Sequence, residues 1–298
     1  MQMTLKVDVD TYRGTLEGVP ALVELFERYD VKATFLFSMG PDHTGRALRR
    51  VFRKGFLGKV RRTSVTSHYG YKTLMYGVLL PGPHIGRKAG HVMRAAATAG
   101  HEVGIHSWDH VRWQDNVARR GEAWAKSEMS KAHGAFVETF GAEPATIGAA
   151  GWQLNRFVPA LEASMGFDYA SDVRGSAPFL PAMEGIESSC VQLPTTLPTL
   201  DELIGRGGIT EHNVHQYVLE TAAQAPPSGH VYTLHAELEG MGLLPVMDRL
   251  LARWKSDGMT IGTMGDLYRS LDPAAVPRKQ IAWGEVPGRS GLLAVEGA

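Results

Sequence analysis

The sequence predicts an α/β fold, an irregular (β/α) barrel of seven or eight parallel strands enclosed by helices. A helical segment, a glycine and a short apolar segment recur along the chain, which is typical of helices that alternate with parallel strands. Eight such apolar segments occur, more than a small doubly wound sheet requires. Polar residues stand at their ends, where barrels of this kind carry their chemistry.

The expected elements follow one another in a regular order. The strands are LKVDVD (5–10), ATFLFS (33–38), EVGIHS (102–107), ATIGAA (145–150), YASDV (169–173), CVQLPT (190–195), VYTLHA (231–236) and MTIGT (259–263). The helices are PALVELFERYD (20–30), GHVMRAAATAG (90–100), SEMSKAHGAFVETFG (127–141), NRFVPALEASMG (155–166), NVHQYVLETAAQ (213–224) and LPVMDRLLARWKSDG (244–258). Pro20 suits the first turn of a helix, and Gly100, Gly141 and Gly166 suit helix ends.

The composition is that of a soluble globular protein. The 298 residues are 44% apolar and 21% charged, with a formal net charge of zero, so no global field attracts nucleic acid or membranes. The single cysteine, Cys190, excludes an intramolecular disulfide and suits a reducing compartment. Because we find neither a signal peptide nor a run of about eighteen apolar residues, we expect a cytoplasmic or peripherally attached protein.

We expect one barrel domain over residues 1–272 and a loose extension over 273–298, where the periodicity is weak. Within the barrel, residues 41–88 form an insertion between the second strand and the next helix. No acidic residue occurs between Asp42 and Glu102. Twelve positive charges fall in that interval: Arg46, Arg49, Arg50, Arg53, Lys54, Lys59, Arg61, Arg62, Lys72, Arg87, Lys88 and Arg94.

Aromatic and aliphatic side chains are interleaved with these charges, which favours an anionic membrane surface as the partner. The side chains expected to face it are Arg53, Lys54, Phe56, Lys59, Arg61 and Arg62. The alternatives are a solvated basic loop and, less favoured, an RNA-contacting patch. We therefore predict binding of anionic lipids and no binding of nucleic acid.

Two carboxylates close the first strand. Asp8 and Asp10 are two residues apart, so their side chains leave the same face, which in a barrel is the interior. A solvated strand end or a helix cap is the simpler interpretation of such a pair. Two inward carboxylates are nevertheless costly to bury without a cation, and a bound metal would offset that cost.

The pattern HSWDH places His106 and His110 four residues apart at the end of the third strand. If the chain turns helically there, both imidazoles lie on one side; two surface histidines on a loop are the alternative. With one aspartate they form a two-histidine, one-carboxylate face with open positions for water and substrate. Such a face suits a catalytic divalent metal, whether zinc, cobalt, manganese, nickel or iron.

Other polar residues at strand ends carry weaker signals. His235 ends the seventh expected strand and, taken alone, is more typical of a packed or surface histidine. Asp172 and Arg174 close the fifth and are compatible with a simple ion pair. The sequence contains no G-x-S-x-G, P-loop or G-x-G-x-x-G pattern.

In order and spacing, the aspartate pair, HSWDH and the late TLH (233–235) resemble the motifs of the polysaccharide deacetylases of the nodulation-deacetylase type. The resemblance covers residues 5 to about 268 and implies an irregular (β/α) barrel. It implies that Asp10, His106 and His110 hold a divalent metal. It further implies that Asp8 is the general base and His235 the general acid.

One family motif is missing. Where an arginine followed by Pro-Tyr is usual, this chain reads AAGWQ (149–153). In many members a later aspartate orients that arginine, which helps to set the base. Our candidate to replace it is Arg174, beside Asp172.

Segments such as SDVRG (171–175) and LPTTLPTLDELIGR (193–206), with the basic insertion, are similar to bacterial deformylases that act on 4-deoxy-4-formamido-L-arabinose linked to undecaprenyl phosphate in lipid A modification. This resemblance implies hydrolysis of a formamide at the cytoplasmic face of the inner membrane. Candidates for contact with the sugar or its phosphate, or for tuning of the site, are Arg13, Trp152, Asp172, Arg174 and Glu237. The oligomeric state stays open.

Three other functions compete with this one. A general N-deacetylase of an oligosaccharide or peptidoglycan would prefer acetyl over formyl substrates. A non-catalytic lipid-phosphate binding protein would show no turnover that chelation abolishes. A two-histidine, one-carboxylate iron oxygenase, the remotest of the three, would depend on oxygen.

Overall fold

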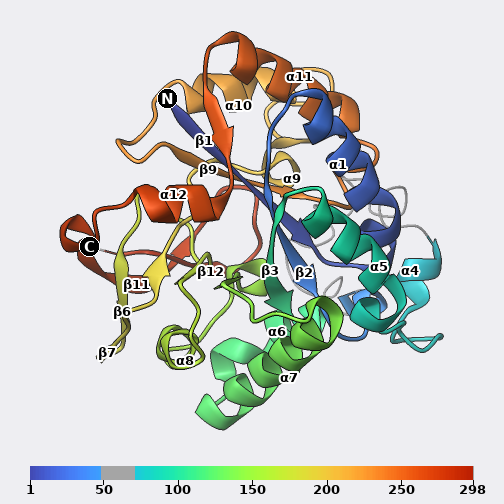
Figure 1. The fold of residues 1–298 in the computed structure, drawn as a ribbon, viewed down its shortest axis with the longest axis vertical. Helices are drawn as coiled ribbons and strands as arrows, with labels where there is room; N and C mark the ends of the chain where they lie inside the picture. The colour runs from blue at the N-terminus through green and yellow to red at the C-terminus, as the bar shows by residue number, and fades with distance from the viewer. Residues whose placement is uncertain (48–70, 298) are drawn as a thin grey trace.

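The computed structural model describes residues 1–47 and 71–297, and its centre is a large parallel sheet (Figure 1). Its strands are β1 (Gln2–Val9), β2 (Thr34–Ser38), β3 (Glu102–Ser107), β4 (Thr146–Ile147), β5 (Tyr169–Ala170), β8 (Val191–Gln192), β9 (His230–His235) and β10 (Thr260–Gly262). Each predicted strand is present, although β4, β5 and β8 are shorter than expected. The predicted α/β class and parallel arrangement are confirmed.

The sheet curves into a half-barrel. Its order is β10-β1-β2-β3-β4-β5-β8, and β9 pairs with the other edge of β1. β1 serves two neighbours on one edge, because residues 2–4 pair with β10 and residues 6–9 with β2. The segment after β8 approaches β9, where Thr196 N donates to Val231 O at 3.0 Å. The strand ends therefore gather around one mouth.

Helices surround the sheet, and most of them cover its outer face (Figure 1). They are the π-helix η1 (Gly14–Gly18) and the helices α1 (Val19–Arg28), α4 (Tyr71–Met75), α5 (Ile85–Thr98), α6 (His110–Asn116), α7 (Glu122–Phe140), α8 (Val158–Ser164), α9 (Leu200–Leu203), α10 (Val214–Ala222), α11 (Leu244–Ser256) and α12 (Met264–Ser270). Short 3-10 turns are η3 (Val117–Arg119), η4 (Ala150–Trp152) and η5 (Pro273–Ala275).

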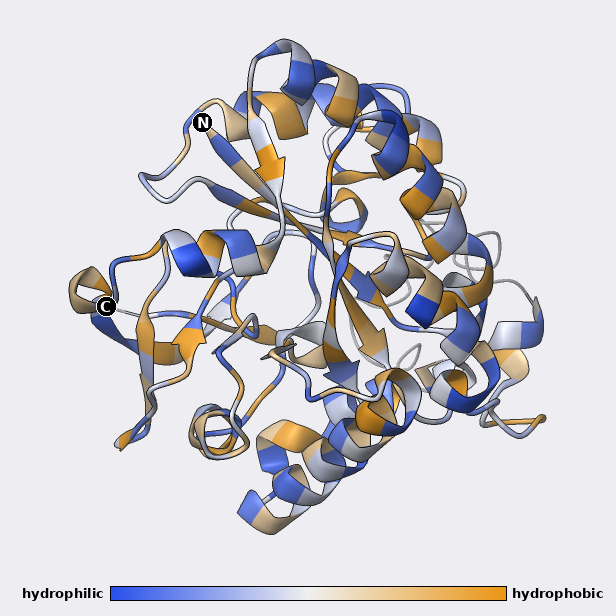
Figure 2. Cartoon of the chain, viewed as in Figure 1, coloured by the Kyte–Doolittle hydropathy of each residue, from blue (hydrophilic) through white to orange (hydrophobic). Residues whose placement is uncertain are grey.

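The core lies between the sheet and these helices. Val7 and Val9 of β1 and Leu22 and Phe26 of α1 are fully buried, and Figure 2 shows the hydrophobic colour gathered on the strands and on one side of the helices. Burial of each such side chain contributes about 1.5–3 kcal/mol. The alternation in KVDVD thus sends valines to the helix layer and the charged residues to the barrel interior.

The predicted loose C-terminal extension is wrong. After η5 the chain forms β11 (Arg278–Glu285) and β12 (Leu292–Glu296), an antiparallel hairpin that pairs with β6 (Leu180–Met183), which in turn pairs with β7 (Ile186–Glu187). Leu293 and Ala294 are buried. Local periodicity did not reveal the hairpin, because its partner strand lies far away in the sequence.

The insertion is described only at its ends. The side chains predicted to face a membrane, namely Arg53, Lys54, Phe56, Lys59, Arg61 and Arg62, lie outside the described residues. Over residues 1–47 and 71–297, no helix combines the length and the apolar character needed to cross a bilayer.

Candidate metal-dependent active site

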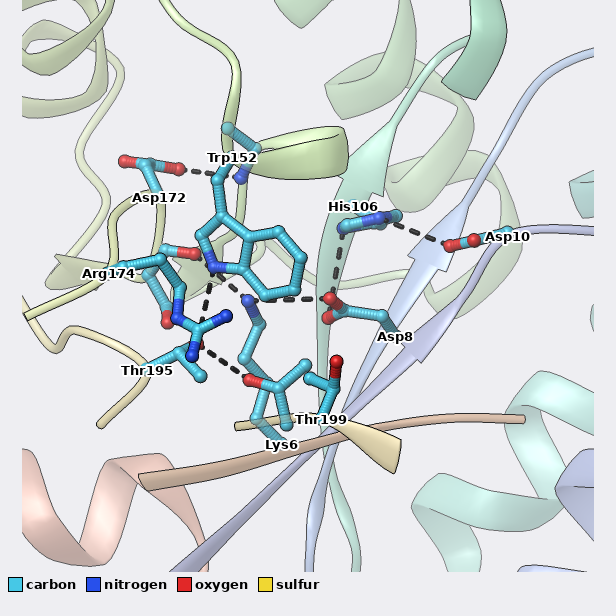
Figure 3. Close-up of polar contacts among 12 residues, drawn as sticks. Lys6, Asp8, Asp10, His106, Trp152, Asp172, Arg174, Thr195 and Thr199 are labelled. Atoms are coloured by element: carbon cyan, nitrogen blue, oxygen red, sulfur yellow. Dashed lines mark hydrogen bonds and ion pairs between the residues drawn. The ribbon is translucent and has the colours of Figure 1, made fainter. Parts of the chain in front are cut away.

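Three predicted ligands meet at the mouth of the half-barrel. Asp10 directly follows β1, His106 lies near the end of β3 and His110 is the first residue of α6. One ligand atom from each lies within 4.8 Å of the other two. His106 Nε2 is 3.2 Å from Asp10 Oδ1, and His110 Nε2 is 3.4 Å from Asp10 Oδ2 (Figure 3 shows the first contact).

Local backbone features set the directions of the two histidine side chains. The register between β2 and β3 shifts so that Phe37 pairs with Ile105 and Ser38 with Ser107, which leaves His106 as the extra residue of a bulge, a device that redirects side chains. Asp109 caps α6 by accepting a hydrogen bond from Arg112 N. The histidines therefore come from a strand end and a helix start, not from the single helical turn expected.

This group of side chains fits a divalent metal. Asp10 Oδ1 is buried and, apart from the 3.2 Å contact with His106 Nε2, finds no hydrogen-bond donor among the described residues. Burial opposes ionisation of Asp10, but His110 and His106 hold the pKa of its carboxyl well below the usual range. Two imidazoles and an ionised carboxylate are ligands for zinc, cobalt, manganese, nickel or iron. The alternative of surface histidines on a loop does not describe this site, because His106 is 3% exposed.

Asp8 and His235 flank the triad. They are direct partners in the parallel pairing of β1 with β9, so their side chains leave the sheet on the same face. Asp8 Oδ1 is 3.8 Å from His106 Nδ1 (Figure 3). Asp8 and His235 are 3% and 8% exposed. A carboxylate and an imidazole thus stand side by side next to the candidate metal face.

Glu237 fixes the backbone at Asp10 and Thr11 through hydrogen bonds. Its Oε1 accepts hydrogen bonds from Asp10 N (3.0 Å), Thr11 N (2.8 Å) and Thr11 Oγ1 (2.8 Å). A Cβ on Gly14 would lie 2.0 Å from the same oxygen, so only glycine fits there. Glu237 is 1% exposed. The sequence predicts that Glu237 contacts the substrate or tunes the site; its hydrogen bonds hold the backbone that carries Asp10, and contact with substrate stays a prediction.

The ion pair that the sequence allows between Asp172 and Arg174 does not form, because each side chain has another partner. Asp172 is fully buried and accepts hydrogen bonds from Ala149 N and Gln192 Nε2, both of 2.6 Å. Arg174 instead pairs with Glu202, with Nη1 and Oε1 2.5 Å apart. Burial raises the pKa of Asp172.

Trp152 cannot offer a free ring to a sugar as expected. It is 2% exposed and its Nε1 donates to Thr195 Oγ1 at 3.3 Å. Guanidinium groups of Arg174 and Arg289 lie 5.1 and 4.7 Å from its ring centroid. Figure 3 shows the indole inside the barrel mouth, between Arg174 and Asp8.

Arg13 lies on the turn after Asp10 and is partly exposed. It forms an ion pair with Glu17, with Nη2 and Oε2 3.0 Å apart. Its predicted contact with the sugar or its phosphate stays a prediction.

Comparison with known proteins identifies the family. The family model for polysaccharide deacetylases matches residues 8–170. A protein of Shewanella sediminis named as a probable 4-deoxy-4-formamido-L-arabinose-phosphoundecaprenol deformylase, ArnD, is 37% identical over 97% of this chain and 92% of its own length. The chain belongs to the polysaccharide deacetylase family. A protein of the same name from Wigglesworthia glossinidia brevipalpis is 30% identical over 95% of this chain and 98% of its own.

Solved structures share the polysaccharide deacetylase fold. A candidate polysaccharide deacetylase from Mycobacterium smegmatis has a TM-score of 0.64 at 18% identity and covers 96% of this chain and 94% of its own. A family 4 acetyl xylan esterase from Clostridium thermocellum, solved with a cobalt ion, has a TM-score of 0.52 at 13% identity over 93% and 97%.

Sequence reasoning about this deacetylase-family chain missed Lys6. Its Nζ lies 3.5 Å from Asp8 Oδ2, whereas Arg174, our candidate for the missing family arginine, is engaged with Glu202. The signal was present, because Lys6 is two residues before Asp8 on the same strand and must share its face.

Glu239, also overlooked, should make folding stability depend on pH. Burial raises its pKa to about 7, although His235 and its backbone N–H oppose the shift. The folded protein then binds an extra proton between the pKa of an unfolded glutamate, about 4.5, and about 7, so this contribution is present at pH 4.5 and is lost as the pH rises through 7.

We expect Glu239→Gln, whose side-chain oxygen can still accept from His235 N, to remove up to about 3 kcal/mol of that pH dependence. Thermal unfolding of both proteins between about pH 5 and 8 measures it. Parallel unfolding profiles would contradict a raised pKa at Glu239.

Proposed function

We propose that this chain is a metal-dependent amide hydrolase that deformylates 4-deoxy-4-formamido-L-arabinose linked to undecaprenyl phosphate. The products are formate and the amino sugar used in lipid A modification, which confers resistance to cationic peptides. The observation that carries the chemistry is the placement of Asp8 and His235 as strand partners beside Asp10, His106 and His110. The names of the two relatives support the substrate.

Each residue has a role in the proposed hydrolysis. Asp10, His106 and His110 would hold the metal, which when bound lowers the pKa of water and polarises the formyl oxygen. Asp8 takes the proton of the attacking water. His235 gives a proton to the departing sugar nitrogen, since an amide anion is too poor a leaving group to depart unaided.

The proposed place of action is the cytoplasmic face of the inner membrane, with peripheral attachment through the insertion. Transfer of a polyprenyl chain from the bilayer into water costs about 0.8 kcal/mol for each methylene exposed. The enzyme must therefore reach the lipid at the membrane. The described end of the insertion offers an apolar tip in the turn after α4, where Figure 2 shows hydrophobic colour. Val78, Leu79 and Leu80 are 52%, 77% and 36% exposed there.

We expect this tip to insert into anionic bilayers. Leu79→Ser should weaken binding to phosphatidylglycerol-containing vesicles about tenfold, because a buried leucine contributes about 1.5 kcal/mol or more. Vesicle co-sedimentation measures the change. Leu292→Ser is the matched control, since Leu292 is 51% exposed on β12, outside the insertion. Equal loss of vesicle binding in both variants, or no loss in Leu79→Ser, would contradict insertion of this tip into the bilayer.

The test of the function is release of formate from the formylated lipid-linked sugar in the presence of a divalent metal. We expect turnover with the formyl substrate, loss on chelation, and much slower reaction of the N-acetyl analogue. Faster reaction of the acetyl analogue would identify a general N-deacetylase. Binding of the lipid without any turnover would identify a binding protein.

A further inference from the structure

Lys6 is a fully buried cation with a fixed position. It occupies β1 on the face that points into the half-barrel and is 0% exposed. Its Nζ donates to Ser171 O at 3.1 Å and lies 3.5 Å from Asp8 Oδ2. Gly148 lies beside the lysine stem, where an added Cβ would be 3.4 Å from Lys6 Cε, at van der Waals contact. A buried charge is tolerated only when it is paired in this way.

The Trp152 indole lies next to the Lys6 ammonium, and Arg289 lies next to the same indole. Lys6 Nζ lies 5.5 Å from the ring centroid of Trp152, at cation–π distance. Arg289 lies 4.7 Å from the same ring and comes from the turn of the C-terminal hairpin. Figure 3 shows Lys6 between the indole and the Asp8 carboxylate.

Arg289 is itself held tightly. Its Nε donates to Glu202 Oε1 at 2.7 Å, and its Nη1 is 3.0 Å from Asp201 Oδ2. Close beside it, a Cβ on Gly288 would lie 2.3 Å from Glu202 O, so the hairpin turn lies directly against α9. The hairpin thus forms part of the wall of the site.

We propose that Lys6 is a positioning residue that orients Asp8, and that Trp152 and Arg289 keep its ammonium away from water. This inference rests on the proposed role of Asp8 as the base. With Oδ2 held by the ammonium, Oδ1 is the oxygen that faces His106. Loss of the ammonium would let the carboxylate rotate away from the attacking water.

The first experiment removes the ammonium while keeping the length of the side chain. In Lys6→Met we expect kcat to fall about 10- to 100-fold, as is usual for residues that orient a catalytic group, with KM and the affinity for Co²⁺ nearly unchanged. Thr4→Val, two residues earlier on the same buried face, is the matched control and should leave kcat unchanged.

A double variant separates positioning from a general structural role. If Lys6 acts through Asp8, Lys6→Met should cause no further loss in kcat when Asp8→Asn is already present. A further loss of about tenfold in that background, or a wild-type kcat in Lys6→Met alone, would overturn the proposal. If Lys6→Met fails to fold alone, the double variant still tests the pairing, because a neutral amide in place of the Asp8 carboxylate leaves no unpaired charge.

The second experiment tests whether Arg289 helps to keep water away from the Lys6 ammonium. We expect Arg289→Met to lower kcat about tenfold and to add little when Lys6→Met is present. Arg278→Met is the control, because Arg278 lies on the same hairpin and pairs with Glu187 but not with Trp152. Equal kinetics of the two arginine variants would remove Arg289 from the proposal.

Failure of the proposed function would look different. If the wild-type protein released no formate, the pairing of Lys6 with Asp8 would still be measured by thermal unfolding of the two single variants and the double variant. Non-additive shifts in Tm support the pairing, and additive shifts contradict it.

Discussion

Asp8→Asn and His235→Ala are each expected to lower kcat about 10²- to 10⁴-fold, the usual contribution of a general base or acid. Neither residue belongs to the metal triad, so Co²⁺ affinity should change little. The two side chains act on the same reaction from paired positions of β1 and β9. The double variant should therefore be hardly slower than either single one. Steady-state formate release and Co²⁺ titration measure these effects.

The controls for this prediction are residues of the same types outside the site. Asp257→Asn at the end of α11 and His91→Ala on the exposed side of α5 should keep wild-type kcat. An Asp8→Asn protein that retains its metal and works nearly as fast as the wild type would disprove the role of Asp8.

Removal of His106 is expected to abolish metal binding and with it essentially all turnover. A ligand that binds only the folded protein stabilises it by about 2.7 kcal/mol at a hundred times its Kd. Addition of Co²⁺ or Zn²⁺ should therefore raise the Tm of the wild-type protein but not that of His106→Ala. A chelator should lower the wild-type Tm back to the value of the metal-free protein.

The Tm response to metal requires no substrate. His91→Ala should respond to metal as the wild type does, since His91 is exposed on α5. An equal metal-induced rise in Tm in His106→Ala would place the metal elsewhere and refute the triad of Asp10, His106 and His110.

Much of the fold was predictable because its strands are short apolar segments between amphipathic helices. All eight strands of the parallel sheet were expected, and Gly100, Gly141 and Gly166 follow helices as predicted, each with a positive φ. The C-terminal hairpin was not expected. Its stability comes from pairing with β6 and from burial of Leu293 and Ala294, and no local pattern records such a distant partner.

The candidate site was also predicted only in part. Asp8, Asp10, His106, His110 and His235 were chosen from motif order, and the structure brings all five to one mouth. The predicted contact of Arg13 with the sugar or its phosphate stays a prediction. Trp152, Asp172, Arg174 and Glu237 are buried or nearly so, and their partners within the protein explain them without substrate.

What the sequence determined by itself was the order of elements and the identity of the chemical groups, because period, glycine placement and motif spacing are local properties. Only the tertiary structure decided which groups meet. The bulge at His106, the strand pairing of Asp8 with His235, and the arrival of Arg289 over Trp152 and Lys6 all depend on contacts between segments far apart in the sequence. Burial makes these contacts necessary, because a charged group removed from water is stable only beside an opposite charge or a hydrogen-bond partner.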